Sequence, residues 1–159
     1  LQNEAMVIFF AGSDREFACL GIENLTGGKE RFVQNSDGAF GLWQLQFAEP
    51  PKPGALRLTG VLDTSRSVFL NPNGQRCHYQ RIADGYRFLW ERLDLPGEPG
   101  VVDVICEVTL RSGKSYAEWN IEVRNRSKKY GLWEYSYPRL RQVFAPGSGD
   151  AMQIGRAHV

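Results

Sequence analysis

Two glutamates, Glu91 and Glu134, are the acidic side chains that most suggest catalysis, because each directly follows a tryptophan. Pairs of carboxyl groups carry out glycoside hydrolysis, and a tryptophan ring offers a flat surface for a sugar. Adjacent residues of a β-strand, however, point to opposite faces of a sheet. We therefore interpret each pair as an inward tryptophan followed by an outward glutamate, and we predict no catalytic residue in this chain.

His78 is the second candidate for chemistry, and it stands between Cys77 and Tyr79 in a predicted strand. Because neighbouring strand residues face opposite sides, Cys77 and His78 cannot readily ligate one metal ion. The sequence has no G-x-S-x-G nucleophile elbow, and the glycines of "GSGD" lack the flanking strand and helix of a phosphate-binding loop. We predict no metal site and no cofactor.

Aromatic residues alternate in two runs, at 86–90 and at 133–137, and each run places three large rings on one face of a predicted strand. Such a face is either part of the core or an exposed shelf for a sugar. Large apolar side chains are usually buried, which favours the core. The shelf stays open as an alternative. Its candidate carbohydrate-binding residues are Tyr86, Trp90, Trp133 and Tyr135.

Composition excludes several classes of partner for this chain of 159 residues with a formal net charge of +1. The longest basic run, at 124–129, falls in a predicted solvated turn, so we predict no nucleic-acid partner. No segment approaches the roughly 18 apolar residues of a membrane helix, so we predict no membrane partner. Cys19, Cys77 and Cys106 permit at most one disulfide, and the compartment stays open. Secretion or a periplasmic location is expected if a signal peptide preceded Leu1.

Period-2 alternation of apolar and polar residues dominates the sequence and predicts strands. The clearest pair of strands, at 101–111 and 115–125, is joined by a turn at 112–114, which predicts a β-hairpin. About ten such runs, one of them at 55–62, are separated by turn residues. We predict an all-β antiparallel β-sandwich with almost no helix. The hairpin residues predicted to be buried are Val104, Cys106, Val108, Trp119 and Ile121.

The last six residues, 154–159, can be encoded by ATCGGAAGAGCACACGTC, which resembles the interior of a common short-read sequencing adapter. In that reading frame the preceding codon must end in AG, and Gln153 satisfies this condition. We therefore predict a sandwich domain over 1–144 and a linker over 145–153 that leads to a missing catalytic domain. The segment 154–159 is then adapter-derived, and a genuine polar tail is the alternative.

Two stretches carry a family resemblance. The opening "LQNEAMVIFFAGSDREFACLGIENLTGGKERFV", with its Asn3–Glu4 pair and its Asn24, Thr26 and Gly27, is similar to the first strands of galactose-mutarotase-like sandwiches attached to glycoside hydrolases. Further along, "VRNRSKKYGLWEYSYPRL" resembles the closing strands of the N-terminal sandwich in an uncharacterised family of glycoside-hydrolase-like proteins. In that family a (β/α)₈ barrel follows and holds the presumed catalytic carboxylates.

This resemblance implies an accessory, non-catalytic domain of a carbohydrate-active enzyme, with carbohydrate and a barrel in the same chain as partners. The catalytic histidine and glutamate of active mutarotases have no evident match, since the context of His78 differs. Two alternatives stay open, an independent carbohydrate-binding module and an aldose epimerase. Exposed coplanar aromatics would favour the module, and a cleft joining His78 to Glu91, Glu107 or Glu134 would favour the epimerase. Buried aromatics with an exposed flat face near the C-terminus would favour the accessory domain.

Overall fold

A computed structural model describes residues 1–13, 16–26, 31–34, 41–50 and 67–140. These residues form ten strands and no helix, and every strand pairing is antiparallel, which confirms the predicted all-β class. The predicted strand at 55–62, the linker and the terminal segment 154–159 lie outside the described residues. The strands are β1 (Met6–Ser13), β2 (Glu16–Asn24), β3 (Arg31–Gln34), β4 (Gln44–Ala48), β5 (Val68–Leu70), β6 (His78–Ile82), β7 (Gly85–Leu95), β8 (Glu98–Thr109), β9 (Glu118–Asn125) and β10 (Gly131–Ser136).

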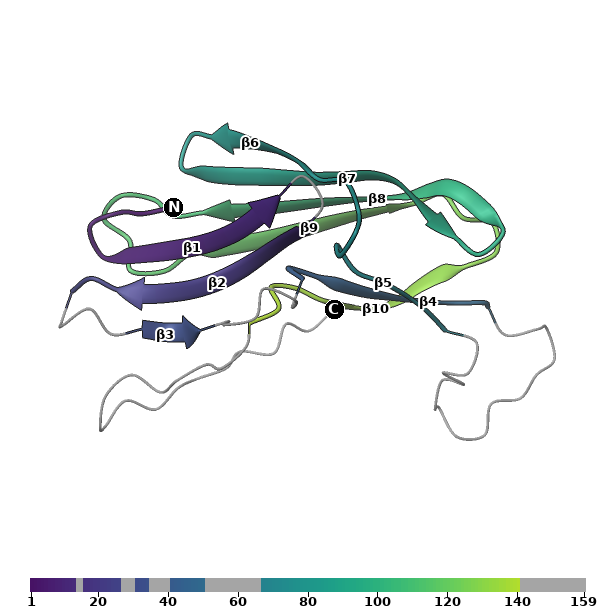
Figure 1. The fold of residues 1–159 in the computed structure, drawn as a ribbon, viewed down its shortest axis with the longest axis horizontal. Coiled ribbons are helices and arrows are strands. Elements are labelled where there is room, and N and C mark those ends of the chain that lie inside the picture. The colour runs from purple at the N-terminus through teal and green to yellow at the C-terminus, as the bar shows by residue number, and fades with distance from the viewer. Residues whose placement is uncertain (14–15, 27–30, 35–40, 51–66, 141–159) are drawn as a thin grey trace.

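Three sheets make up the sandwich (Figure 1). The largest has the strand order β6-β7-β8-β9 and faces two smaller sheets, β1-β2-β3 and β10-β4-β5. Ring contacts join the layers: Phe10 of β1 lies 5.5 Å from Phe88 of β7, and Trp43, just before β4, lies 5.5 Å from Trp90 of β7. The large sheet therefore packs its inner face against both smaller sheets.

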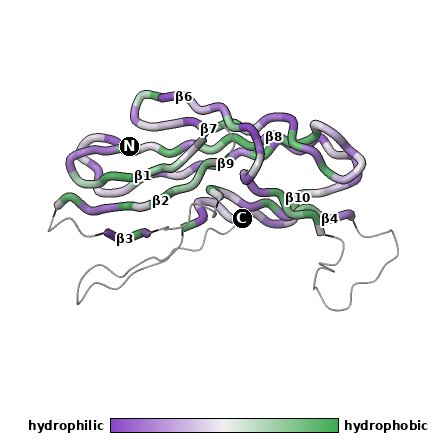
Figure 2. Tube along the Cα trace, viewed as in Figure 1, coloured by the Kyte–Doolittle hydropathy of each residue, from purple (hydrophilic) through white to green (hydrophobic). Residues whose placement is uncertain are grey.

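Alternation along the central strands builds the core. In β8, Val104, Cys106 and Val108 are fully buried, as predicted. Trp119 and Ile121 of β9 pack against the core but are only half-buried, so their predicted burial was too strong. The difference follows from strand order, because β9 is an edge of the large sheet. Hydrophobic segments recur along the paired strands, whereas β6 is more hydrophilic (Figure 2).

The Asn3–Glu4 pair fastens the start of the chain to the β8–β9 turn. The Asn3 side-chain amide donates hydrogen bonds to the carbonyls of Arg111 and Lys114, each at 2.7 Å. The Glu4 carboxylate accepts the backbone N–H of Gly113, which has a positive φ of 75° that favours glycine. Two residues that sequence analysis noted only through a resemblance therefore have a structural role.

Register shifts interrupt the regular pairing in several strands, and two of them bear on the aromatic runs. In β7 the register shifts after Trp90, and Arg92 takes a left-handed conformation with φ of 55°. Asp103 of β8 supports this bulge, because its carboxylate accepts a hydrogen bond from the Arg92 N–H at 2.8 Å. The same carboxylate accepts two hydrogen bonds from the guanidinium of Arg126. The bond from Arg126 lowers the pKa of Asp103 from 3.8 to about 2. In β10 the register shifts between Leu132 and Glu134.

All three cysteines are buried and free of disulfide bonds. Burial raises the pKa of the Cys19 thiol to about 11 and that of the Cys77 thiol to about 12, so both stay protonated and weakly nucleophilic at neutral pH. Cys77 is buried whereas His78 is exposed, as expected for neighbours on opposite faces of a strand.

Candidate functional site

The two candidate carbohydrate-binding residues in β7 are Trp90, which lies in the core, and Tyr86, which packs against it. Trp90 is 0% exposed and packs edge-on against Trp43, so a carbohydrate cannot reach its ring, and Trp90 is withdrawn as a binding residue. Tyr86 is half-buried, and its ring centroid lies 6.3 Å from Phe88 and 6.5 Å from Tyr79. The physical reason is the central position of β7, whose inner face is covered by the smaller sheets.

The two candidates in β10 are exposed: Trp133 by 56% and Tyr135 by 40%. A bulge lies between them, because Leu132 pairs with Phe47 and Glu134 pairs with Gln46, which leaves Trp133 as the extra residue. Both bulge residues then oppose Gln46. The predicted single aromatic face at 133–137 is therefore interrupted at Trp133.

The side of the β10-β4-β5 sheet that carries Gln46 faces away from the core, and we call it the β4 face. One row of it runs across three strands from Glu134 through Gln46 to Phe69, which is 51% exposed. The Gln46 amide donates a hydrogen bond to the Ser67 hydroxyl at 2.9 Å, which fixes its orientation. The residues that make up the β4 face are Gln44, Gln46, Phe69, Glu134 and Ser136, with Trp133 beside Glu134 in the β10 bulge. Gln46 is largely buried, with 8% of its surface exposed.

A shallow hollow of about 100 Å³ lies on the β4 face between Phe69 and Glu134, and Tyr135 adds to its lining. Sequence analysis missed Phe69 and both glutamines, although one signal was present. In "LWQLQF" the glutamines alternate with Leu45 and Phe47, which places the amides opposite the core. No comparable signal identified Phe69, because β5 has only three residues.

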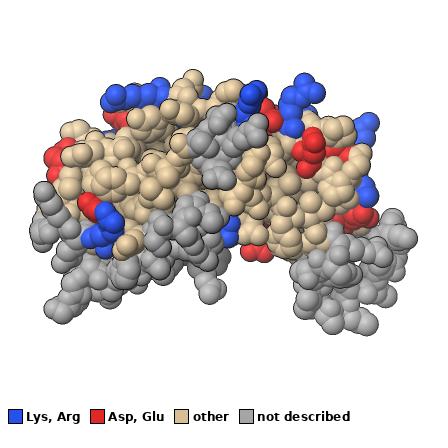
Figure 3. Space-filling view, in the orientation of Figure 1, with Lys and Arg blue, Asp and Glu red and all other residues tan. Residues whose placement is uncertain are grey.

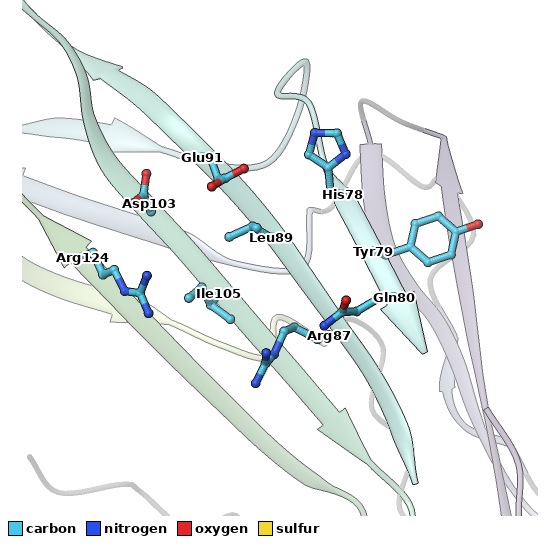
Figure 4. A pocket seen from close by; sticks show the side chains of 9 residues that line it. All are labelled: His78, Tyr79, Gln80, Arg87, Leu89, Glu91, Asp103, Ile105 and Arg124. Carbon is cyan, nitrogen blue, oxygen red and sulfur yellow. The ribbon is translucent and has the colours of Figure 1, made fainter. Parts of the chain in front are cut away.

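The outer face of the large sheet carries a separate groove of about 310 Å³ (Figure 4). Its floor is apolar, since Leu89 of β7 lies opposite Ile105 of β8. Figure 4 shows His78 and Glu91 toward one end of the groove and Arg87 toward the other. The structure therefore brings His78 and Glu91 together in one groove, the arrangement that sequence analysis linked to an epimerase.

Ion pairs neutralise much of the charge around this groove. Arg87 donates from Nε to a Glu107 carboxylate oxygen at 2.6 Å, and Arg124 donates to Glu122 at 2.7 Å. Acidic and basic side chains also lie side by side along the rims of the face in Figure 3, and the described residues between them are mostly uncharged. We therefore find no large patch of one charge on that face.

Within the described ranges, no three His, Cys, Asp or Glu side chains gather closely enough to hold a metal ion. In the same residues, no helix is long and apolar enough to cross a membrane. Comparison of the chain with protein-family models, with curated proteins and with solved structures finds no match.

Proposed function

We propose that this sandwich is a non-catalytic accessory domain of a carbohydrate-active enzyme and that its β4 face binds glycan. The observation that carries the proposal is the exposure of Phe69 beside the side-chain amides that line the hollow, together with the exposed Trp133 on β10 of the same sheet. Large aromatic side chains are normally buried, and exposed apolar groups rimmed by polar ones mark interaction sites. The resemblance of the sequence to sandwiches attached to glycoside hydrolases supports the same function.

The chemistry of the β4 face suits a sugar. The face of an aromatic ring is electron-rich and attracts the C–H groups on one side of a pyranose ring. Amide and hydroxyl groups of Gln44, Gln46 and Ser136 both donate and accept hydrogen bonds, as sugar hydroxyls require. A face of this kind holds a glycan without acting on it.

The placement of acidic residues supports a non-catalytic role. Glycosidases need two carboxyl groups on either side of the scissile bond, about 5 to 10 Å apart. Glu134 is the one carboxylate among the described residues of the β4 face, whereas Glu91 lines the groove on the large sheet. Asp103 lines the same groove as Glu91, but its carboxylate already accepts hydrogen bonds from Arg126 and from the Arg92 N–H. These outer faces lie on opposite sides of the sandwich, so the two glutamates do not share a substrate. We propose that a barrel in the same chain supplies the catalytic carboxylates.

Affinity electrophoresis in gels that contain soluble polysaccharides tests the glycan-binding role. Neutral glucans, xylans and mannans form the panel. At least one should retard the chain, and Trp133→Ala should abolish the retardation. Tyr116→Ala is the matched control, because Tyr116 is 53% exposed but lies near the β8–β9 turn. Equal migration of the wild type and Trp133→Ala on every polysaccharide would contradict the proposal.

A second candidate function, aldose epimerisation, is favoured by the groove that contains both His78 and Glu91. An epimerase needs an acid and a base at one sugar, and these two side chains have no hydrogen-bond partner among the described residues. Polarimetry with freshly dissolved glucose or galactose measures this activity directly. The epimerase predicts faster mutarotation that is lost in His78→Ala and in Glu91→Gln, whereas the accessory domain predicts the uncatalysed rate.

A further inference from the structure

We infer that the β4 face takes a neutral oligosaccharide that lies across the strands, rather than a monosaccharide or an acidic glycan. This inference rests on the proposed function and adds the size, direction and charge of the ligand. It follows from how the two exposed rings, the amides and the single carboxylate are distributed over β10, β4 and β5.

The spacing of the two rings sets the size of the ligand. Trp133 lies on β10 and Phe69 on β5, and β4 runs between them. Neighbouring strands are about 4.8 Å apart, so the outer two strands of this sheet are separated by about 10 Å. One six-membered sugar ring cannot cover both aromatic side chains at that separation. A ligand that uses both must therefore contain linked sugar rings.

Polar groups between the rings set the direction of the chain. The pairing of Glu134 with Gln46 and of Gln46 with Phe69 forms a row perpendicular to the strands. Gln44 pairs with Ser136 in the neighbouring row. A glycan along the first row would contact the Phe69 ring at one end and Glu134, next to Trp133, at the other, and it would pass over the largely buried Gln46 amide. The hydrogen bond from Gln46 to Ser67 holds that amide in place before a ligand binds.

Charge on the β4 face excludes acidic glycans. Glu134 is the one charged residue among those that make up the face, and no described cation forms an ion pair with it. A uronate in the adjacent position would face a like charge across a short distance, which disfavours binding. A neutral sugar meets no such repulsion and can donate its hydroxyl hydrogens to the Glu134 carboxylate.

A length series tests this inference. Isothermal titration would use neutral oligosaccharides of one to five rings from the polysaccharide that retards the chain, or glucose- and xylose-based series if none does. We expect the affinity to rise at least about fivefold from one ring to three rings and then to level off. Phe69→Ala should remove this rise, Phe69→Tyr should keep it because a flat ring remains, and Trp133→Ala should weaken every length.

Charge is tested with oligogalacturonides of the same lengths. The wild type should not bind them, and Glu134→Gln should bind them detectably while keeping its affinity for the neutral series. Tyr116→Ala is again the control. Polysaccharide binding without length dependence, or with a length dependence that survives Phe69→Ala, would overturn the inference and leave the proposed function standing. Absence of binding to every polysaccharide and oligosaccharide would overturn both.

Discussion

The aromatic runs of β7 and β10 look alike in sequence, but they lie in opposite environments. Phe88 and Trp90 of β7 are fully buried between the layers, whereas Trp133 and Tyr135 of β10 are exposed. Both runs place a large aromatic residue at every second position, and both contain a Trp–Glu pair. Alternation of aromatic residues therefore predicts a strand, but it does not tell a core strand from a ligand-binding one.

Two physical differences separate the runs. The first is strand order: β7 lies between β6 and β8, whereas β10 is an edge strand with a neighbour on one side. The second is the position of the bulge. In β7 the bulge follows Trp90, so the alternation of the rings is unbroken. In β10 the bulge falls between Leu132 and Glu134, so the alternation from Trp133 to Tyr135 is broken.

The largest effect expected from this comparison is the loss of stability in Trp90→Ala. Removing the ring leaves a cavity beside Trp43, and substitutions of this kind cost about 3–5 kcal/mol. Urea unfolding followed by circular dichroism would measure the change. A cost below about 1 kcal/mol would mean that the inner face of β7 is not the core, and the contrast between the two runs would fail.

A smaller effect concerns Asp103, which supports the β7 bulge. The folded pKa of about 2 lies below the ordinary value of 3.8, so the ionised carboxylate stabilises the fold above about pH 4. That stabilisation is lost as the pH falls toward 2. We expect Asp103→Asn to cost about 1 kcal/mol at pH 7, since Arg126 is half-exposed and solvent screens the pair.

The unfolding midpoints of the wild type and Asp103→Asn, measured between pH 7 and pH 2, check this expectation. The difference in stability between the two proteins should shrink below pH 4. Protonation of the other carboxylates affects both proteins equally and therefore does not change this difference. A difference that stays constant with pH would show that Asp103 acts through shape and not through charge.

Much of the fold was predictable from local pattern. The alternation in β8 and β9 and the glycine-containing turn between them identified the hairpin, because one face of each strand must be apolar. The half-burial of Trp119 was not predictable, since it depends on β9 being an edge strand. Order in a sheet is set by contacts between distant segments, which a period-2 pattern does not contain.

The candidate site was predictable only in part. Trp133 and Tyr135 were identified as aromatic residues on a strand, but their exposure depends on the edge position of β10. The break in the alternation after Trp133 comes from a bulge that has no glycine or proline to mark it in "LWEY". Phe69 is part of the site because β5 pairs with β4. The two strands are far apart in the sequence, so a local pattern does not predict that they pair.

A third and smaller effect tests the β7 bulge itself. Arg92 has a φ of 55°, a conformation that costs a residue with a side chain about 1–2 kcal/mol, and glycine pays about 0.5–1 kcal/mol in entropy instead. Arg92→Gly should therefore raise stability by about 0.5 kcal/mol, because its N–H still binds Asp103. Arg92→Ala keeps the strain and is the control. A clear loss of stability in Arg92→Gly would mean that the Arg92 side chain, and not the backbone, secures the bulge.

The smallest stability effect is expected for Trp133→Ala, the counterpart of Trp90→Ala in β10. Trp133 is the most exposed of the four tryptophans, and its ring has no aromatic partner among the described residues. Surface substitutions away from caps and networks change stability by about 0.5 kcal/mol or less, so the unfolding midpoint should stay almost unchanged. Acrylamide quenching should show most of the accessible tryptophan fluorescence disappear, because Trp43 and Trp90 are fully buried and Trp119 is half-buried. If Trp133→Ala instead destabilised the chain by 2 kcal/mol or more, Trp133 would be a packing residue, and its exposure could not be explained by a ligand.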